Sequence, residues 1–224
     1  MARTVHHLNC GTFQPLGGRR IDGKGSFTHV ATLVCHCLLV QLPDALVLID
    51  AGIGLTDIAD PTQRLGVDFL RRVRPMLDRT ETAVQQVARL GYEPQDVRHI
   101  VLTHLDRDHA GGPADFPDAK VHVHQPTLQA ALHPATRRDQ DRHRSRQWAH
   151  GPKWQSHPTD GEQWLTESDS PHCPPGLRFF QRKAQADQQV RLDNQRRLRE
   201  LRAAGAVTVC SAHDPVEFGA LSTR

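Results

Sequence analysis

The sequence predicts a single α/β domain spanning residues 1–224, in which short buried strands alternate with helices. Two short apolar runs surround a Pro-Asp turn, apolar residues recur at helical spacing between 79 and 90, and another apolar run leads directly into a polar cluster. A chain of 224 residues is long enough to bury one substantial core. These observations favour a mixed architecture over an all-helical or all-strand one.

The first two apolar runs predict a β-hairpin. Residues 32–42 are rich in Leu, Val and Cys, Pro43-Asp44 interrupts them, and the run Ala-Leu-Val-Leu-Ile-Asp resumes at 45–50. The second strand ends in Asp50-Ala-Gly52-Ile-Gly54, where glycines suit a tight loop that approaches another part of the backbone.

A helix is predicted from Arg79 to Leu90, with Asp78 and Glu81 as a capping pair and Gly91 as its stop. Further strands are predicted at 99–103, 120–124 and 206–210, and another helix at 176–204.

Bulk composition argues against several classes of protein. A net charge of +3 is too small to indicate nucleic-acid binding by itself. No apolar stretch is long enough to cross a bilayer, and residues 1–9 lack the apolar core of a signal peptide. The five scattered cysteines do not suggest a disulfide framework. We expect a cytoplasmic protein without a membrane or nucleic-acid partner, and its oligomeric state stays open.

The polar cluster is the strongest chemical signal. His104, Asp106, Asp108 and His109 place four potential metal ligands within six positions, directly after a predicted buried strand. Gly111-Gly112 follows and lets the chain turn away. The alternative, an exposed polar loop, does not explain why the four ligands stand so close to a strand end.

These residues resemble a known family. Thr103-His-Leu-Asp-Arg-Asp-His-Ala-Gly-Gly112 looks like the His-x-His-x-Asp-His loop of the metallo-β-lactamase superfamily, Asp50-Ala-Gly52 resembles its upstream turn, and Ser211-Ala-His213 resembles its late histidine loop. The order agrees over residues 6–130 and 173–219. N-acyl homoserine lactonase-like metallo-hydrolases are the most similar subgroup.

The resemblance implies an αββα sandwich with one or two Zn²⁺ ions and a small-molecule substrate whose ester or lactone carbonyl is hydrolysed. One ion would be held by His104 and the residue at 106, the other by Asp108, His109 and His213. Asp108 would also orient the attacking water, and Asp50 would position the ligand loop. Thioesters, β-lactams and phosphoesters stay open as substrates.

The sequence departs from this pattern in two ways. Position 106 is Asp where the signature has His, which could shift the metal preference towards Mn²⁺ or Fe²⁺. The Gly-His-Thr-x-Gly-His stretch and a Gly-Asp segment are absent, and residues 165–173 stand where several strands are expected. We therefore expect an incomplete second half, with an irregular segment at 133–175 that lacks strands.

This apparent internal deletion leaves two hypotheses. The chain is either an active metallo-hydrolase or a truncated, inactive relative that binds one metal or none. His150, His157 and His172 could replace the missing ligand, although surface positions suit them better. A third hypothesis, a basic nucleic-acid-binding module, depends on the Arg-rich helix at 176–204 alone.

Other candidate residues have ordinary structural explanations. Cys35-His36-Cys37 could bind metal, but a strand would place the two thiols on one buried face. His122 and His124 would share one strand face, and His6-His7 would lie on a surface strand. Trp148 and Trp154 could line a substrate entrance, but packing beneath a loop suits them better.

Overall fold

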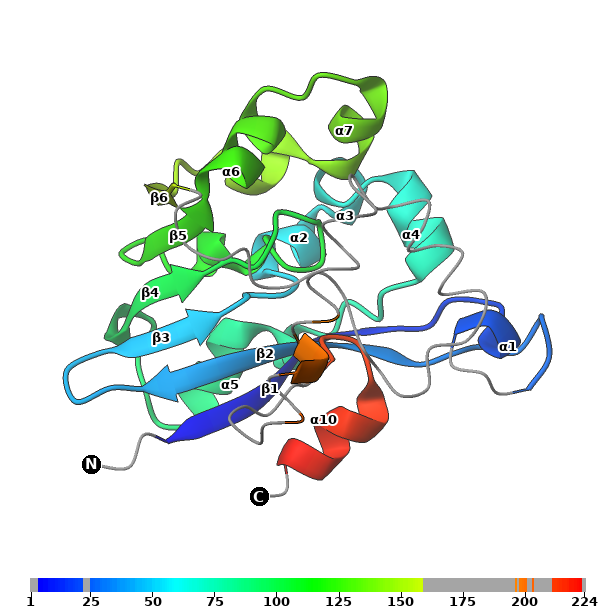
Figure 1. The fold of residues 1–224 in the computed structure, drawn as a ribbon, viewed down its shortest axis with the longest axis horizontal. Helices are drawn as coiled ribbons and strands as arrows, with labels where there is room; N and C mark the ends of the chain where they lie inside the picture. The colour runs from blue at the N-terminus through cyan, green and yellow to red at the C-terminus, as the bar shows by residue number, and fades with distance from the viewer. Residues whose placement is uncertain are drawn as a thin grey trace.

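The computed structural model describes residues 4–21, 25–158, 196, 198–200, 203 and 211–222. Its centre is a six-stranded sheet in which the strands follow one another in chain order (Figure 1). The strands are β1 (Val5–Phe13), β2 (Leu33–Gln41), β3 (Leu46–Ile49), β4 (Val97–Val101), β5 (Lys120–His124) and β6 (Lys153–His157).

The sheet changes direction at β3. Strands β1, β2 and β3 pair antiparallel, and β3 to β6 pair parallel. The predicted hairpin is confirmed, because Leu38 of β2 lies opposite Ile49 of β3. Since parallel strands end at the same edge of a sheet, the loops that follow β3 and β4 start side by side.

Helices connect and cover the strands. The α-helices are α1 (Gly18–Ile21), α2 (Leu55–Ala59), α3 (Pro61–Arg64), α4 (Val67–Val73), α5 (Ala83–Arg89), α6 (Gln125–Leu132), α7 (Arg137–Arg142) and α10 (Pro215–Ser222). Short 3₁₀ segments are η1 (Arg79–Glu81), η2 (Pro94–Asp96), η3 (Gly112–Asp115) and η4 (Ser145–Trp148). Within the described ranges no helix is both long and apolar enough to span a membrane.

The predicted helix at 79–90 is split in two. Residues 79–81 form η1, and α5 begins only after Thr82, whose backbone is extended. Asp78 caps η1 through the Thr80 N–H, but Glu81 does not complete a capping box. Its carboxylate instead accepts hydrogen bonds from the Thr12 N–H at 2.7 Å and the Thr12 hydroxyl at 2.6 Å, so a contact with β1 replaces the predicted local one.

Successive side chains of β2 point to opposite faces of the sheet, one facing the apolar core and the other facing α10. Cys35, Cys37 and Leu39 are fully buried, and their face lies in the same core as Val84 and Val87 of α5. His36 points the other way, towards Phe218 of α10, with ring centroids 5.2 Å apart. Figure 1 shows α10 in front of β1 and β2, with α5 behind them.

Residues 133–158 are more ordered than predicted. The sequence predicts no strand there, yet β6 pairs with β5 from Lys153 opposite Lys120 to His157 opposite His124. Alternation is weak in β6, the last strand of the described sheet, because its side chains are mostly exposed and carry no apolar signal. The rest of the irregular segment, the predicted strand at 206–210 and His172 lie outside the described residues, as does most of the predicted 176–204 helix.

Candidate metal site

The site forms where the chain leaves β3 and β4. Asp50 follows β3, and its backbone N–H donates to the carbonyl of Val101, the last residue of β4, at 2.9 Å. Asp50 has a left-handed backbone with φ of 57°, which is uncommon outside glycine. This conformation turns a carboxylate only 4% exposed towards the loop that follows β4.

Glycines let the two loops pack without side chains between them. The N–H groups of Gly111 and Gly112 donate to the Gly52 carbonyl at 3.0 and 3.1 Å. A Cβ on Gly111 would lie 1.7 Å from Asp57 Oδ2, and one on Gly112 would lie 2.2 Å from the Ala51 carbonyl oxygen. The close backbone approach expected from the glycine-rich sequence is present.

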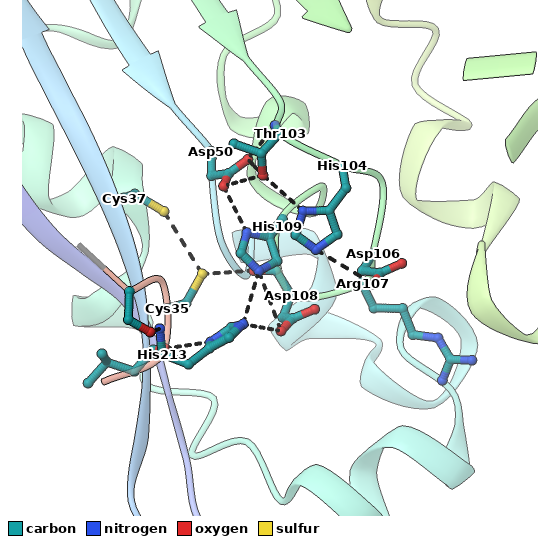
Figure 2. Close-up of polar contacts among 12 residues, drawn as sticks. Cys35, Cys37, Asp50, Thr103, His104, Asp106, Arg107, Asp108, His109 and His213 are labelled. Atoms are coloured by element: carbon teal, nitrogen blue, oxygen red, sulfur yellow. Dashed lines mark hydrogen bonds and ion pairs between the residues drawn. The ribbon is translucent and has the colours of Figure 1, made fainter. Parts of the chain in front are cut away.

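Asp50 fixes the ring nitrogens of two histidines. The His109 Nδ1 lies 2.9 Å from Asp50 Oδ2, and because this carboxylate only accepts, Nδ1 carries the proton. The Thr103 hydroxyl contacts both Asp50 oxygens, at 3.0 and 2.7 Å, so its hydrogen points to Asp50. Thr103 Oγ1 then accepts from His104 Nδ1 at 2.8 Å. Both imidazoles therefore direct Nε2 into the site (Figure 2).

His213 reaches the same site from the other end of the chain. Residues 211–213 lie against β2, where His36 N–H donates to the Ala212 carbonyl at 2.8 Å. The His213 Nδ1 lies 2.8 Å from the Val34 carbonyl oxygen, which can only accept, so this imidazole too presents Nε2. The His213 ring is thus oriented by the backbone of a strand.

Three ligand atoms converge. His109 Nε2 lies 3.4 Å from His213 Nε2, and Asp108 Oδ2 lies 3.7 Å from the first and 3.8 Å from the second. Figure 2 shows the three side chains directed at one another. Tetrahedral Zn²⁺ with bonds of about 2.0–2.1 Å separates its ligands by roughly 3.4 Å. The donor set and its spacing therefore fit one divalent ion.

The electrostatics of the site also favour a cation. Burial opposes a positive charge on His109, yet Cys35, Asp50 and Asp108 around it raise its pKa well above the usual value. Burial acts against ionisation of Asp50, but the charge and hydrogen bond of His109 lower its pKa. Two Nε2 atoms that face each other at 3.4 Å need a proton or a metal ion between them.

Asp106 stands apart from this cluster. Its carboxylate forms a two-point ion pair with Arg142, through Nε to Oδ1 and through Nη2 to Oδ2 at 3.0 Å. Asp106 Oδ2 also lies 3.6 Å from His104 Nε2. His104 itself groups with Asp50 and His109 among the described residues. The structure thus brings together four of the five predicted ligands, in two groups that share His109. It places the fifth, Asp106, beside Arg142.

Several supporting residues were missed in the sequence. Asp57 of α2 is fully buried and accepts from the Gly54 N–H at 3.0 Å, Arg64 Nε at 2.6 Å and Gln147 Nε2 at 3.3 Å. Gln147 also donates to the Arg107 carbonyl at 2.8 Å, inside the ligand loop. The two Gln147 contacts link residues 90 and 40 positions apart, so no local sequence pattern could predict them.

The other candidates have structural roles. Cys35 and Cys37 lie on the buried face with sulfurs 3.9 Å apart, and His36 points to the opposite face, where its Nε2 meets His7 Nδ1 at 2.8 Å. His157 contacts His122 at 2.9 Å on β5 and β6. Trp148 is 9% exposed in the core, as packing beneath a loop requires.

Several known proteins are similar to this chain in sequence. A probable metallo-hydrolase of Mycobacterium tuberculosis is 47% identical over 160 residues, which are 71% of this chain and 47% of that protein. An N-acyl homoserine lactonase of Bacillus thuringiensis is 29% identical over 97 residues, 43% of this chain and 39% of the relative. This chain therefore spans about half the length, or less, of these relatives.

Solved structures share the fold. An N-acyl homoserine lactone hydrolase with the product N-hexanoyl-L-homoserine at its catalytic metal centre superposes with a TM-score of 0.54 at 22% identity, covering 70% of this chain and 60% of the other. The sequence profile of the metallo-β-lactamase superfamily matches residues 30–177. The predicted fold class is confirmed, and this chain belongs to the metallo-β-lactamase superfamily.

Proposed function

We propose that this protein is a metal-dependent hydrolase that acts on the carbonyl of an ester or lactone in a small molecule. The observation that supports this most is the convergence of Asp108, His109 and His213, with the two Nε2 atoms 3.4 Å apart. The lactone class comes from the relatives named N-acyl homoserine lactonase. Lactones are cyclic esters, so the same carbonyl chemistry covers both.

Two imidazoles and a carboxylate are a donor set found in catalytic zinc sites, which keep one position open for water or substrate. Zn²⁺ is the ion we propose, with Mn²⁺ or Fe²⁺ as alternatives. A divalent ion in this position supplies Lewis acidity, which polarises a carbonyl oxygen and lowers the pKa of water.

The residues of the chain have separate roles in this proposal. Asp50 and the Val34 carbonyl keep His109 and His213 in the tautomer that offers Nε2. Asp108 directs Oδ2 at both histidines, which leaves its second oxygen to accept a hydrogen bond from the attacking water and hold its proton. Its side chain is 18% exposed, so water can reach it.

Metal content and chelation test this function. Protein purified without added metal should contain a divalent ion and hydrolyse a lactone or simple ester, and a chelator should abolish turnover. Asp108→Ala should also lose turnover, whereas Asp118→Ala, an exposed aspartate paired with Lys153, should retain it. Turnover that survives both chelation and Asp108→Ala would contradict the proposal.

A second candidate is an inactive relative that binds one metal or none. The pairing of Asp106 with Arg142 favours it, as does the absence of the Gly-His-Thr-x-Gly-His stretch that the family resemblance leads us to expect. One bound ion without turnover on any lactone or ester would support this candidate instead.

A further inference from the structure

Arg142 stands where a second metal ion would compete for Asp106. We infer that the Arg142 guanidinium occupies a second cation position beside His104 and Asp106 and so limits the site to one divalent ion. This inference rests on the proposed metal site at Asp108, His109 and His213. It assigns a residue outside the ligand loop to the control of metal number.

The contacts leave little of the Asp106 carboxylate for a metal. Arg142 engages both oxygens, and Oδ2, which accepts from Nη2 at 3.0 Å, is the atom that lies 3.6 Å from His104 Nε2. Two parallel charge-assisted hydrogen bonds of this kind are among the stronger side-chain contacts in proteins. A metal between His104 and Asp106 would have to displace the guanidinium.

Arg142 is held in place by its own helix. It ends α7, which begins with a capping box between Thr136 and Asp139. The Arg142 carbonyl accepts from Arg107 Nε at 3.4 Å, and Arg107 is in turn bound to Asp68 at 3.0 Å. The backbone of residue 142 is thus tied to the ligand loop, and the guanidinium, whose side chain is 46% exposed, is positioned by its two contacts with Asp106.

A further imidazole follows Arg142 directly in the chain, at the end of α7. The Nδ1 of His143 is buried and has no hydrogen-bond partner among the described residues. Removing the Arg142 charge would leave His104 and Asp106, 3.6 Å apart, as ligands for a second ion whose other positions water can fill.

Zinc stoichiometry tests the inference. Metal-free wild type, Arg142→Gln, Asp106→Asn and the Asp106→Asn/Arg142→Gln double variant are saturated with Zn²⁺, desalted and analysed by mass spectrometry for metal per chain. Wild type and Asp106→Asn should each hold about one ion, Arg142→Gln about two, and the double variant about one. Arg137→Gln removes the same charge from the first turn of α7 and should match wild type.

The outcomes separate this inference from the proposed function. Two ions in wild type, no gain in Arg142→Gln, or loss of the ion in Asp106→Asn would each overturn the role of Arg142. If circular dichroism shows that Arg142→Gln does not fold, Arg142→Met is the second variant; it should also hold about two ions, and one ion in it would overturn the inference. A wild type that binds no Zn²⁺ contradicts the proposed function. The number of zinc ions gained per chain in Arg142→Gln over wild type then still tests the role of Arg142.

Discussion

The imidazoles of His109 and His213 face each other with their Nε2 atoms 3.4 Å apart, although 104 positions separate them in the chain. Each ring is fixed by a different support, the Asp50 carboxylate for His109 and the Val34 carbonyl for His213. Two ring nitrogens so oriented make a cation the natural occupant of the space between them.

Replacing His213 should remove one of three ligands. For His213→Ala we expect the affinity for Zn²⁺ to fall by more than the roughly 10–100-fold that loss of a supporting residue causes. Competition with a chromophoric chelator measures the change. His157→Ala is the matched control, since His157 contacts His122 on β5, and equal losses in both variants would refute the role of His213.

Asp50→Asn should weaken metal binding without touching a ligand. The amide cannot supply the negative charge that raises the pKa of His109, and it accepts more weakly from Nδ1. We expect a loss of about 10–100-fold in Zn²⁺ affinity, measured by isothermal titration calorimetry. Asp44→Asn, in the exposed turn between β2 and β3, should bind like wild type, and unchanged affinity in Asp50→Asn would contradict the orienting role.

Gly111→Ala should destabilise the fold, because its Cβ would lie 1.7 Å from Asp57 Oδ2. Asp57 cannot retreat freely, since Arg64 holds it at 2.6 Å. We expect a loss of about 1–3 kcal/mol in the free energy of unfolding, measured by urea denaturation. Gly219→Ala, in helix α10, where no atom of the described residues lies within 4 Å of the added Cβ, should be neutral or slightly stabilising. Similar stability in the two variants would show that the loops do not pack as closely as described.

Asp115 should make stability depend on pH. Burial raises the pKa of Asp115 from 3.8 to about 6, and the Asp57 charge adds to this, while the Leu55 N–H opposes it. The unfolded chain therefore loses this proton at a lower pH than the folded chain does. As a result, the free energy of unfolding falls as pH rises from about 4 to 6. One to two pKa units correspond to about 1–3 kcal/mol.

Asp115→Asn removes this titration and keeps an oxygen that can accept from the Leu55 N–H at the same position. The free energy of unfolding of the variant should fall less than that of wild type between about pH 4 and 6.5. Asp118→Asn, an aspartate 74% exposed in the same loop, should follow wild type. Parallel pH curves for wild type and Asp115→Asn would contradict the raised pKa.

The sequence predicted those parts of the fold whose signals are local. Apolar runs and the Pro-Asp turn located β2 and β3, and closely spaced ligands after β4 located the site. The sequence could not locate β6, because a strand whose side chains are mostly exposed has no apolar alternation.

The supports of the site depend on contacts between distant residues. Arg142 reaches Asp106 across 36 positions, and Gln147 reaches Asp57 across 90. Neither pair has a spacing that helical or strand periodicity could reveal. Only the resemblance to a family pointed to His213, since nothing near it in the chain marks it as a ligand.

A crystal structure of the zinc-loaded protein, with anomalous scattering recorded at the zinc absorption edge, would locate the ion itself. We expect a peak within about 2.0–2.2 Å of His109 Nε2, His213 Nε2 and an Asp108 carboxylate oxygen. A peak at another set of residues, or an empty pocket with the His213 ring turned away from His109, would contradict the proposed metal site.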